Sequence, residues 1–129
     1  MKRYCYALDL IDDEKLIEEY IHYHNNVWPE IQESILNTGI KLMEIYHISN
    51  RLFMITEVDE TFSLNKKNNN KNKIKVEEWE NLMWKYQKAL PTAKKGEKWL
   101  LMNKIYHLEN NDSTKENIFQ KKVKKIKNE

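Results

Sequence analysis

The order in which hydrophobic residues change their spacing along the chain limits the fold more than any other feature. Large apolar residues that alternate with small or polar ones predict strands, and apolar residues every three or four positions predict helices. These patterns come in the order strand, helix, helix, strand, strand, helix, strand, at residues 4–10, 14–24, 29–38, 41–48, 51–58, 74–90 and about 98–108. This βαββαβ order predicts a ferredoxin-like α+β sandwich, with one antiparallel sheet and helices on one of its faces.

Acidic residues, prolines and one glycine mark where the predicted helices begin and end. Asp12 and Asp13 are good N-caps for the first helix, and Pro29 is placed to begin the second. Gly39 is a natural stop for the second helix, as Pro91 is for the third. The inward residues that helical spacing predicts are, helix by helix, Leu16, Ile17, Tyr20, Ile21 and His24; Ile31, Ile35 and Leu36; and Val76, Trp79, Leu82, Met83, Tyr86 and Leu90.

The chain divides into one predicted domain and a tail. It has 129 residues, 40% of them hydrophobic, which is enough for a single core. Residues 1–108 form the predicted domain and carry 16 basic and 16 acidic side chains. Residues 109–129 are rich in Asn and Lys, and we expect a flexible extension there; a short apolar stripe within it leaves membrane-surface or partner binding as the alternative. The Asn/Lys-rich stretch 63–73 predicts a surface loop.

Charge and apolar runs exclude two classes of partner. A nucleic-acid-binding fold would show a basic patch on its folded part, whereas residues 1–108 are neutral. No apolar run approaches the roughly 20 residues that a membrane span requires. Residues 1–4 lead straight into strand-like sequence without the apolar stretch of a secretory signal. We therefore expect a cytoplasmic protein that binds neither nucleic acid nor membrane.

The residue types that hold metals and cofactors are scarce. Cys5 is the single cysteine, which excludes an intramolecular disulfide and a cysteine-based metal site. The chain has two glycines, too few for a Gly-rich phosphate loop. His22 and His24 are two positions apart on a predicted helix and point in different directions. The sequence thus predicts no metal and no cofactor.

Both faces of the predicted sheet carry large apolar residues. In the predicted strand 51–58, Leu52, Met54 and Val58 alternate with Phe53 and Ile55. The helices of one chain cover only one sheet face, so the other must be covered by something else. Two such sheets facing each other would meet this need, which predicts a homodimer.

Tyr20 and His24 are the polar residues that the pattern places inside. They are four positions apart on the helical stripe that also holds Leu16 and Ile17. Inward polar groups must find hydrogen bonds in the core or in a ligand, and histidine exchanges protons near neutral pH. Spacing alone favours a buried pair satisfied by backbone carbonyls over a functional one. Trp84 lies beside the stripe of its helix and is placed to border a cavity, although core packing is the commoner use.

A specific sequence signature favours the functional interpretation of Tyr20 and His24 over the structural one. Residues 19–30, Glu-Tyr-Ile-His-Tyr-His-Asn-Asn-Val-Trp-Pro-Glu, resemble the pattern Glu-Tyr-x-x-x-His-Asn-x-x-Trp-Pro-Glu of the L-rhamnose mutarotase family. The resemblance continues in order over about residues 1–108. Its further matches are Gly39, Ile45, Tyr46, Arg51, Leu52, Phe53, Trp84, Lys85 and Tyr86.

The resemblance implies a cofactor-free, dimeric α/β-barrel enzyme that interconverts the α and β anomers of a free 6-deoxyhexose. The histidine that matches His24 is the family's proposed proton donor, and the tyrosine that matches Tyr20 contacts the sugar. The family's Trp-Trp pair is Met83-Trp84 here, so Trp84 alone carries over as a sugar-binding residue. Met43 stands where the family has a further sugar-contacting tyrosine. L-rhamnose is the expected sugar, with L-fucose as its competitor.

The chemistry implied by the family needs one acid and one base, each contributing roughly 10²–10⁴-fold. His24 fills one part, and Tyr20, Glu44 or water are open for the other. Two other functions stay open at this point: a non-catalytic binding or structural module on the same fold, and a cofactor-free oxygenase or cyclase, since one scaffold hosts many activities.

Overall fold

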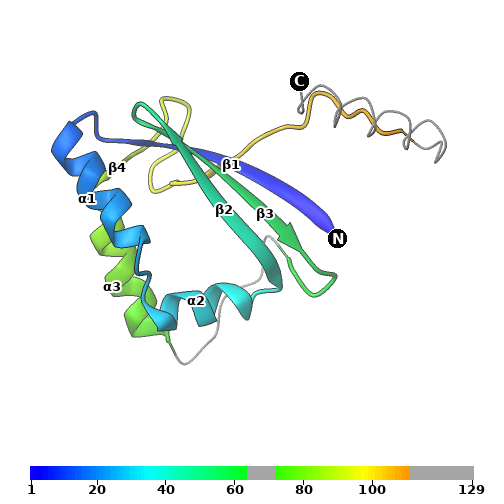
Figure 1. The fold of residues 1–129 in the computed structure, drawn as a ribbon, viewed down its shortest axis with the longest axis horizontal. Helices are drawn as coiled ribbons and strands as arrows, with labels where there is room; N and C mark the ends of the chain where they lie inside the picture. The colour runs from blue at the N-terminus through cyan, green and yellow to red at the C-terminus, as the bar shows by residue number, and fades with distance from the viewer. Residues whose placement is uncertain (64–71, 111–129) are drawn as a thin grey trace, which may run out of the picture.

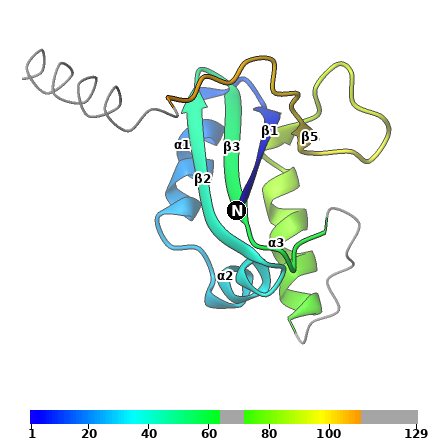
Figure 2. The same cartoon turned by 90° about the vertical axis from the view of Figure 1, so that its right-hand side faces the viewer.

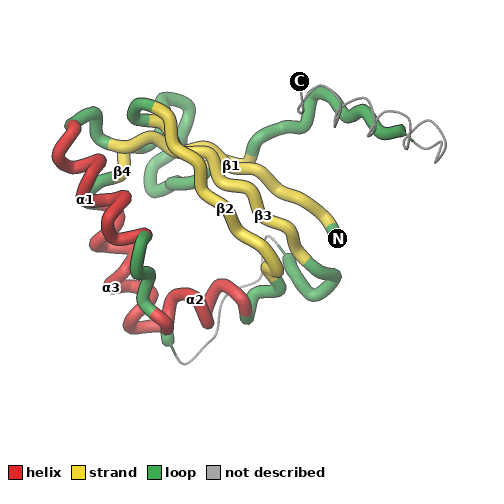
Figure 3. Tube along the Cα trace, in the orientation of Figure 1, coloured by secondary structure: helices red, strands yellow, loops and turns green. Residues whose placement is uncertain are grey.

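The structure, a computed structural model, describes residues 1–63 and 72–110 (Figures 1 and 3). Residues 64–71 of the predicted 63–73 loop and residues 111–129 of the predicted tail lie outside the described residues. In the described part the elements are β1 (Lys2–Leu10), α1 (Glu14–His24), α2 (Pro29–Leu36), β2 (Ile40–Ile48), β3 (Arg51–Val58), α3 (Lys73–Trp84), β4 (Gln87–Lys88) and β5 (Leu100–Leu101). The predicted α+β fold with a curled antiparallel sheet is confirmed.

β1 is the central strand of this sheet. The strand order is β2-β3-β1-β4, and β5 also pairs with β1. β1 and β3 are antiparallel along almost their whole length, from Lys2 opposite Val58 to Asp9 opposite Arg51. β4 and β5 therefore share the other edge of β1. Figure 2 shows β2, β3 and β1 side by side with the helices behind them.

Local sequence rules account for the ends of α1 and α2. The Asp13 carboxylate accepts a hydrogen bond from the Leu16 backbone N–H at 3.0 Å, a cap that contributes about 1 kcal/mol. Pro29 begins α2. Gly39 follows α2 with φ +98°, and a Cβ there would lie 2.7 Å from Thr61 Oγ1. Only glycine fits this turn, which aims the chain into β2.

α3 is shorter than the sequence predicts. The predicted helix 74–90 with Pro91 as its stop is wrong at its C-terminal end, because α3 ends at Trp84. Gln87 and Lys88 pair with the end of β1 instead. Strand pairing requires extended backbone, so the hydrogen bonds gained on β1 exclude a helical conformation at these positions.

The last predicted strand, about 98–108, is also mostly wrong. Leu100 and Leu101 pair with β1, and the Met102 N–H donates to the carbonyl oxygen of Cys5 at 2.8 Å. From there the chain leaves the sheet on the side opposite the helices (Figure 1). The sequence alternates as a strand would, but within residues 1–63 and 72–110 no strand pairs with residues 103–108.

The core lies between the sheet and the helices. It is formed by Leu10, Tyr20, Ile31, Leu52, Trp79, Met83 and Tyr86. Two residues predicted to point inward do not: Ile21 is 42% and Leu36 is 59% exposed. In α2 the buried positions are Ile31 and Ser34, which shows that this short helix turns a narrow stripe toward the core.

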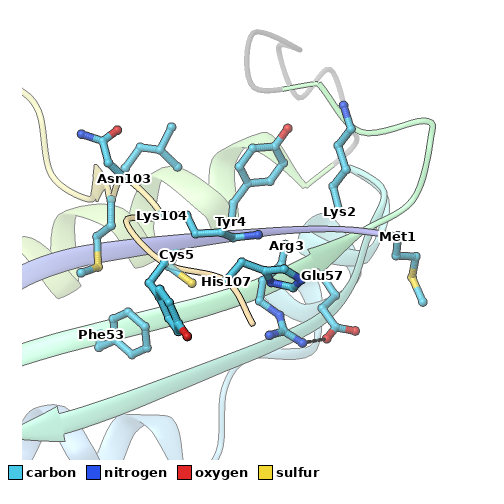
Figure 4. A pocket seen from close by; sticks show the side chains of 13 residues that line it. Met1, Lys2, Arg3, Tyr4, Cys5, Phe53, Glu57, Asn103, Lys104 and His107 are labelled. Carbon is cyan, nitrogen blue, oxygen red and sulfur yellow. Dashed lines mark hydrogen bonds and ion pairs between the residues drawn. The ribbon is translucent and has the colours of Figure 1, made fainter. Parts of the chain in front are cut away.

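The sheet face opposite the helices, called the outer face below, is only partly covered. It consists of the alternate strand residues Arg3, Cys5, Ala7, Asp9, Leu42, Glu44, Tyr46, Ile48, Arg51, Phe53, Ile55 and Glu57. Tyr46 is 53% and Ile48 74% exposed there. On the same side the chain after β5 exposes Ile105, at 95%, and Leu108, at 79%. Figure 4 shows the open hollow, about 1070 Å³, between this segment and the start of β1.

We expect the protein to form a homodimer that buries the outer face, because isolated domains rarely expose so many large apolar side chains together. Tyr46→Lys would place a charge within that face and should shift the dimer toward monomer in light scattering at micromolar concentration. Ile74→Lys is the matched control, since Ile74 is 73% exposed on α3, on the helix side. A wild-type protein that is monomeric at micromolar concentration would contradict the expectation.

Candidate functional site

A cavity of about 430 Å³ lies between the inner face of the sheet and the three helices. Its size falls within the usual range for small-molecule sites. Its apolar lining residues are Val27, Ile31, Ile35, Ile40, Met43, Ile45, Met54, Val76, Trp79, Met83 and Trp99. Its polar lining residues are Tyr20, His24, Ser34, Thr38, Glu80, Gln87 and Lys98. A mostly apolar wall with a few convergent polar groups is typical of a pocket that binds and orients a small molecule.

The geometry of His24 fixes which of its ring nitrogens is available. Nδ1 lies 2.8 Å from the carbonyl oxygen of Tyr20, one turn earlier in α1. A carbonyl can only accept, so Nδ1 carries a hydrogen and donates it, and Nε2 of the neutral ring keeps its lone pair. Burial lowers the pKa of His24 below its ordinary value, and the hydrogen bond to Tyr20 opposes this in part. His24 is therefore a neutral imidazole near pH 7 with Nε2 as a proton acceptor.

Tyr20 is almost fully buried, at 2% exposure. Its hydroxyl oxygen accepts a hydrogen bond from Gln87 Nε2 at 3.3 Å. The pKa of Tyr20 is raised to about 12: burial raises it most, the hydrogen bond from Gln87 lowers it, and the charge of Glu80 raises it. Tyr20 consequently stays protonated at neutral pH and acts as a hydrogen-bonding group rather than as a base.

Aromatic rings hold the histidine in place. The His24 ring lies 4.5 Å from the Tyr20 ring and 5.8 Å from Trp79, measured between centroids, and meets Trp79 edge-on. Trp28 packs edge-on against Trp79 from the start of α2, at 5.1 Å. These contacts restrict the rotation of the imidazole, so its direction is set before any ligand binds.

A salt bridge joins two of the lining elements. Lys98 Nζ lies 2.8 Å from Glu80 Oε2 and also donates to the Glu80 carbonyl oxygen at 3.2 Å. The same ammonium group lies 4.9 Å from the centre of the Trp84 ring. Trp84, 40% exposed, thus contacts a residue of the wall without lining the cavity itself.

The structure brings Tyr20 and His24 together in one wall of the cavity and leaves Trp84 outside it. Glu44, one candidate for the second proton-transfer group, is exposed on the outer face, away from the cavity. Sequence reasoning missed Gln87, because it placed this residue in a helix. It also gave Trp99 no place in the site, since only the tertiary path of the chain after α3 brings Trp99 to the cavity.

The described residues hold neither a metal-binding cluster nor a membrane-spanning helix. In residues 1–63 and 72–110 no three His, Cys, Asp or Glu side chains come together as a metal site would require. No helix in the same part of the chain is long and apolar enough to cross a membrane. The larger hollow on the outer face is more open and is walled by the segment after β5, so the cavity between the sheet and the helices is the better site for a small molecule.

The fold and the site together define a small α+β protein whose pocket is lined in part by tryptophans and holds a neutral histidine beside a tyrosine. Comparison with known proteins identifies the family. Residues 3–108 match the family model described as L-rhamnose mutarotase. The chain belongs to the L-rhamnose mutarotase family.

Two relatives by sequence support this membership, and one solved structure shares the fold. An L-fucose mutarotase of Xanthomonas campestris pv. campestris is 40% identical over 111 residues, covering 84% of this chain and 89% of that protein. A Dictyostelium discoideum protein whose name states no activity is 39% identical over 113 residues, covering 84% and 90%. The crystal structure of an L-rhamnose mutarotase from Formosa agariphila shares the fold, with a TM-score of 0.62, 20% identity and coverage of 84% of this chain and 100% of that one.

The lowered pKa of His24 has a consequence for stability. In the unfolded chain His24 binds a proton near pH 6.5, whereas in the folded protein its pKa is lower. Acidification below about pH 6.5 therefore favours unfolding. We expect His24→Gln to lose less unfolding free energy than the wild type between pH 7 and pH 5, measured by urea denaturation. His22→Gln, a change at an exposed site on the same helix, should behave as the wild type does. Equal pH dependence in His24→Gln and the wild type would contradict this account.

Proposed function

We propose that the protein is a sugar mutarotase, an isomerase that interconverts the α and β anomers of a free 6-deoxyhexose by acid/base ring opening. The observation that carries the proposal is the oriented, neutral imidazole of His24 beside Tyr20 in a largely apolar cavity. Membership of the L-rhamnose mutarotase family and the similarity to an L-fucose mutarotase support the same reaction.

The proposed reaction uses His24 as a proton carrier. Nε2 accepts the proton of the anomeric hydroxyl, the bond between the anomeric carbon and the ring oxygen breaks, and the ring oxygen is protonated. The open-chain aldehyde then rotates about its first carbon–carbon bond, and the same steps in reverse close the ring as the other anomer. Both oxygens are bonded to the anomeric carbon, so the imidazolium formed in the first step lies near the oxygen that must receive a proton. Positioned acid/base catalysis of this kind contributes roughly 10²–10⁴-fold.

Tyr20 has a separate part in this proposal. Its raised pKa keeps the phenol protonated, so it offers a hydrogen bond to a sugar hydroxyl and does not compete with His24 for protons. Its ring packs against the imidazole. We keep Trp84 as a proposed sugar-binding residue through its contact with Lys98, which lines the cavity.

The apolar wall supports a 6-deoxyhexose as the substrate. Such a sugar carries a methyl group where an ordinary hexose carries a hydroxymethyl group. A methyl group fits a wall of Met43, Met54 and Ile45 without leaving a hydroxyl unpaired. We propose L-rhamnose first and L-fucose as the alternative, since the matched family and the Xanthomonas relative carry these two names.

The protein's setting follows from the same proposal. A free sugar is the small-molecule partner, and a second copy of the chain covers the outer face. We propose a cytoplasmic location. Cys5 is the single cysteine and cannot form an intramolecular disulfide, which agrees with a reducing compartment.

His24→Ala should abolish catalysed anomer exchange, because it removes the proton carrier while leaving the fold intact. Exchange NMR on L-rhamnose and L-fucose at equilibrium measures the rate directly and ranks the two sugars. His22→Ala is the matched control, because His22 is exposed on the same helix and does not line the cavity. Wild-type exchange rates in folded His24→Ala would overturn the catalytic role. An inactive wild type would favour a binding module or a cofactor-free oxygenase or cyclase instead.

Tyr20→Phe should cost less than His24→Ala. It keeps the buried ring and removes one hydroxyl, so we expect kcat/KM to fall by about tenfold or less, as for a hydrogen bond of about 0.5–1.5 kcal/mol. Tyr23→Phe is the control, since Tyr23 lies on the same helix, packs on Trp79 and does not line the cavity. A loss in Tyr20→Phe as complete as that in His24→Ala would mean that the phenol itself transfers protons.

A further inference from the structure

Gln87 is a buried polar residue in the wall of the cavity that neither local sequence nor the proposed reaction explains. It is 8% exposed and stands at the start of β4, opposite Leu10 of β1. Its backbone is fixed there by the sheet, so its side chain cannot move to solvent without breaking strand pairing. It shares the cavity with Tyr20 and His24.

Half of the Gln87 side chain has no partner. Nε2 donates to the Tyr20 hydroxyl oxygen at 3.3 Å, and Oε1 is buried without a hydrogen bond to any of the described residues. Exchanging the two ends of the amide would let the Tyr20 hydroxyl donate to Oε1 and would leave Nε2 unpaired instead. In either orientation one hydrogen-bonding group of this cavity-lining side chain is buried and unsatisfied. Buried polar groups of this kind are uncommon in native proteins and destabilise them.

The surroundings restrict what can pair with this group. None of the other described residues that line the cavity forms a hydrogen bond with Gln87 Oε1. A molecule that enters the cavity can supply the missing partner. A neutral carboxamide matches a neutral hydroxyl, which can either donate to Oε1 or accept from Nε2.

We propose that the carboxamide of Gln87 binds one ring hydroxyl of the sugar and so selects among 6-deoxyhexoses. This inference rests on the proposed mutarotase function. A site built to hydrogen-bond a hydroxyl rejects a sugar that lacks it, or carries it in the other orientation, because the buried amide is then left unpaired. Gln87 also holds the Tyr20 hydroxyl, so it aligns two sugar contacts at once.

The test compares the wild type with Gln87→Met, which keeps a side chain of similar length and removes both polar ends. Exchange NMR gives kcat and KM for the better of L-rhamnose and L-fucose and for its derivatives lacking one ring hydroxyl. We expect Gln87→Met to raise KM by about tenfold with a smaller change in kcat. We also expect the wild type to discriminate strongly against one deoxy derivative and Gln87→Met to lose that discrimination. Gln32→Met is the control, since Gln32 is exposed on α2, outside the cavity.

Thermal unfolding with and without sugar is the second measurement, and it separates a loss of sugar binding from a loss of the fold. Without sugar, the melting temperature of Gln87→Met is the baseline for that variant, because the change removes the unpaired group and also the hydrogen bond to the Tyr20 hydroxyl. Gln87→Leu serves as a second variant if the methionine packs poorly. Added sugar should raise the melting temperature of the wild type more than that of either variant. An active wild type whose KM and deoxy-sugar discrimination are unchanged in both variants would overturn the role of Gln87 alone. A wild type that neither exchanges anomers nor is stabilised by sugar would overturn the proposed function and this inference together.

Discussion

The backbone pairing between β4 and the end of β1 is the contact on which the site depends. Leu10 faces Gln87 across this short ladder, and the Ile11 N–H donates to the carbonyl oxygen of Tyr86 at 2.8 Å beside it. The pairing ends α3, puts Tyr86 into the core and holds Gln87 against Tyr20. A slip of one residue in the ladder would turn the Gln87 side chain to the other face of the sheet. The register of these two residue pairs therefore decides whether the Gln87 side chain lines the cavity.

Burial acts on His24 and Tyr20, two of the titratable groups that line the cavity, with one result. It lowers the pKa of His24 and raises that of Tyr20, because a charged form is costly in either case. Both side chains are thus neutral near pH 7, whereas the charges of Lys98 and Glu80 are paired with each other. Neutral groups at Tyr20 and His24 suit an uncharged sugar, and a neutral imidazole can accept a proton and return it.

The two faces of the sheet serve different purposes. The inner face, with Met54 and Ile45, forms part of the cavity wall, and the helices close the cavity from the other side. The outer face keeps Tyr46 and Ile48 largely exposed, and the chain after β5 adds more apolar surface on that side. A sheet that is apolar on both faces needs two covers, and one chain with three described helices supplies only one of them.

The sequence predicted the elements that local rules control. Asp13, Pro29 and Gly39 fix the ends of α1 and α2 through capping and backbone conformation, and each acts on neighbours close in the chain. Helical spacing placed Tyr20 and His24 on one inward face, and the structure has them in one wall of the cavity. The signature around them carried the family, since it lies within one continuous segment.

The positions that the sequence did not determine are those that depend on distant strands. Residues 85–90 continue a helical pattern, yet pairing with β1, more than 70 residues earlier, draws Gln87 into the sheet. Residues 103–108 alternate like a strand, yet no strand in the described part of the chain pairs with them. Trp84 and Trp99 look alike from composition, but only Trp99 lines the cavity, because the path of the chain between β4 and β5 brings it there. Periodicity states which residues share a face, whereas long-range hydrogen bonding decides what that face meets.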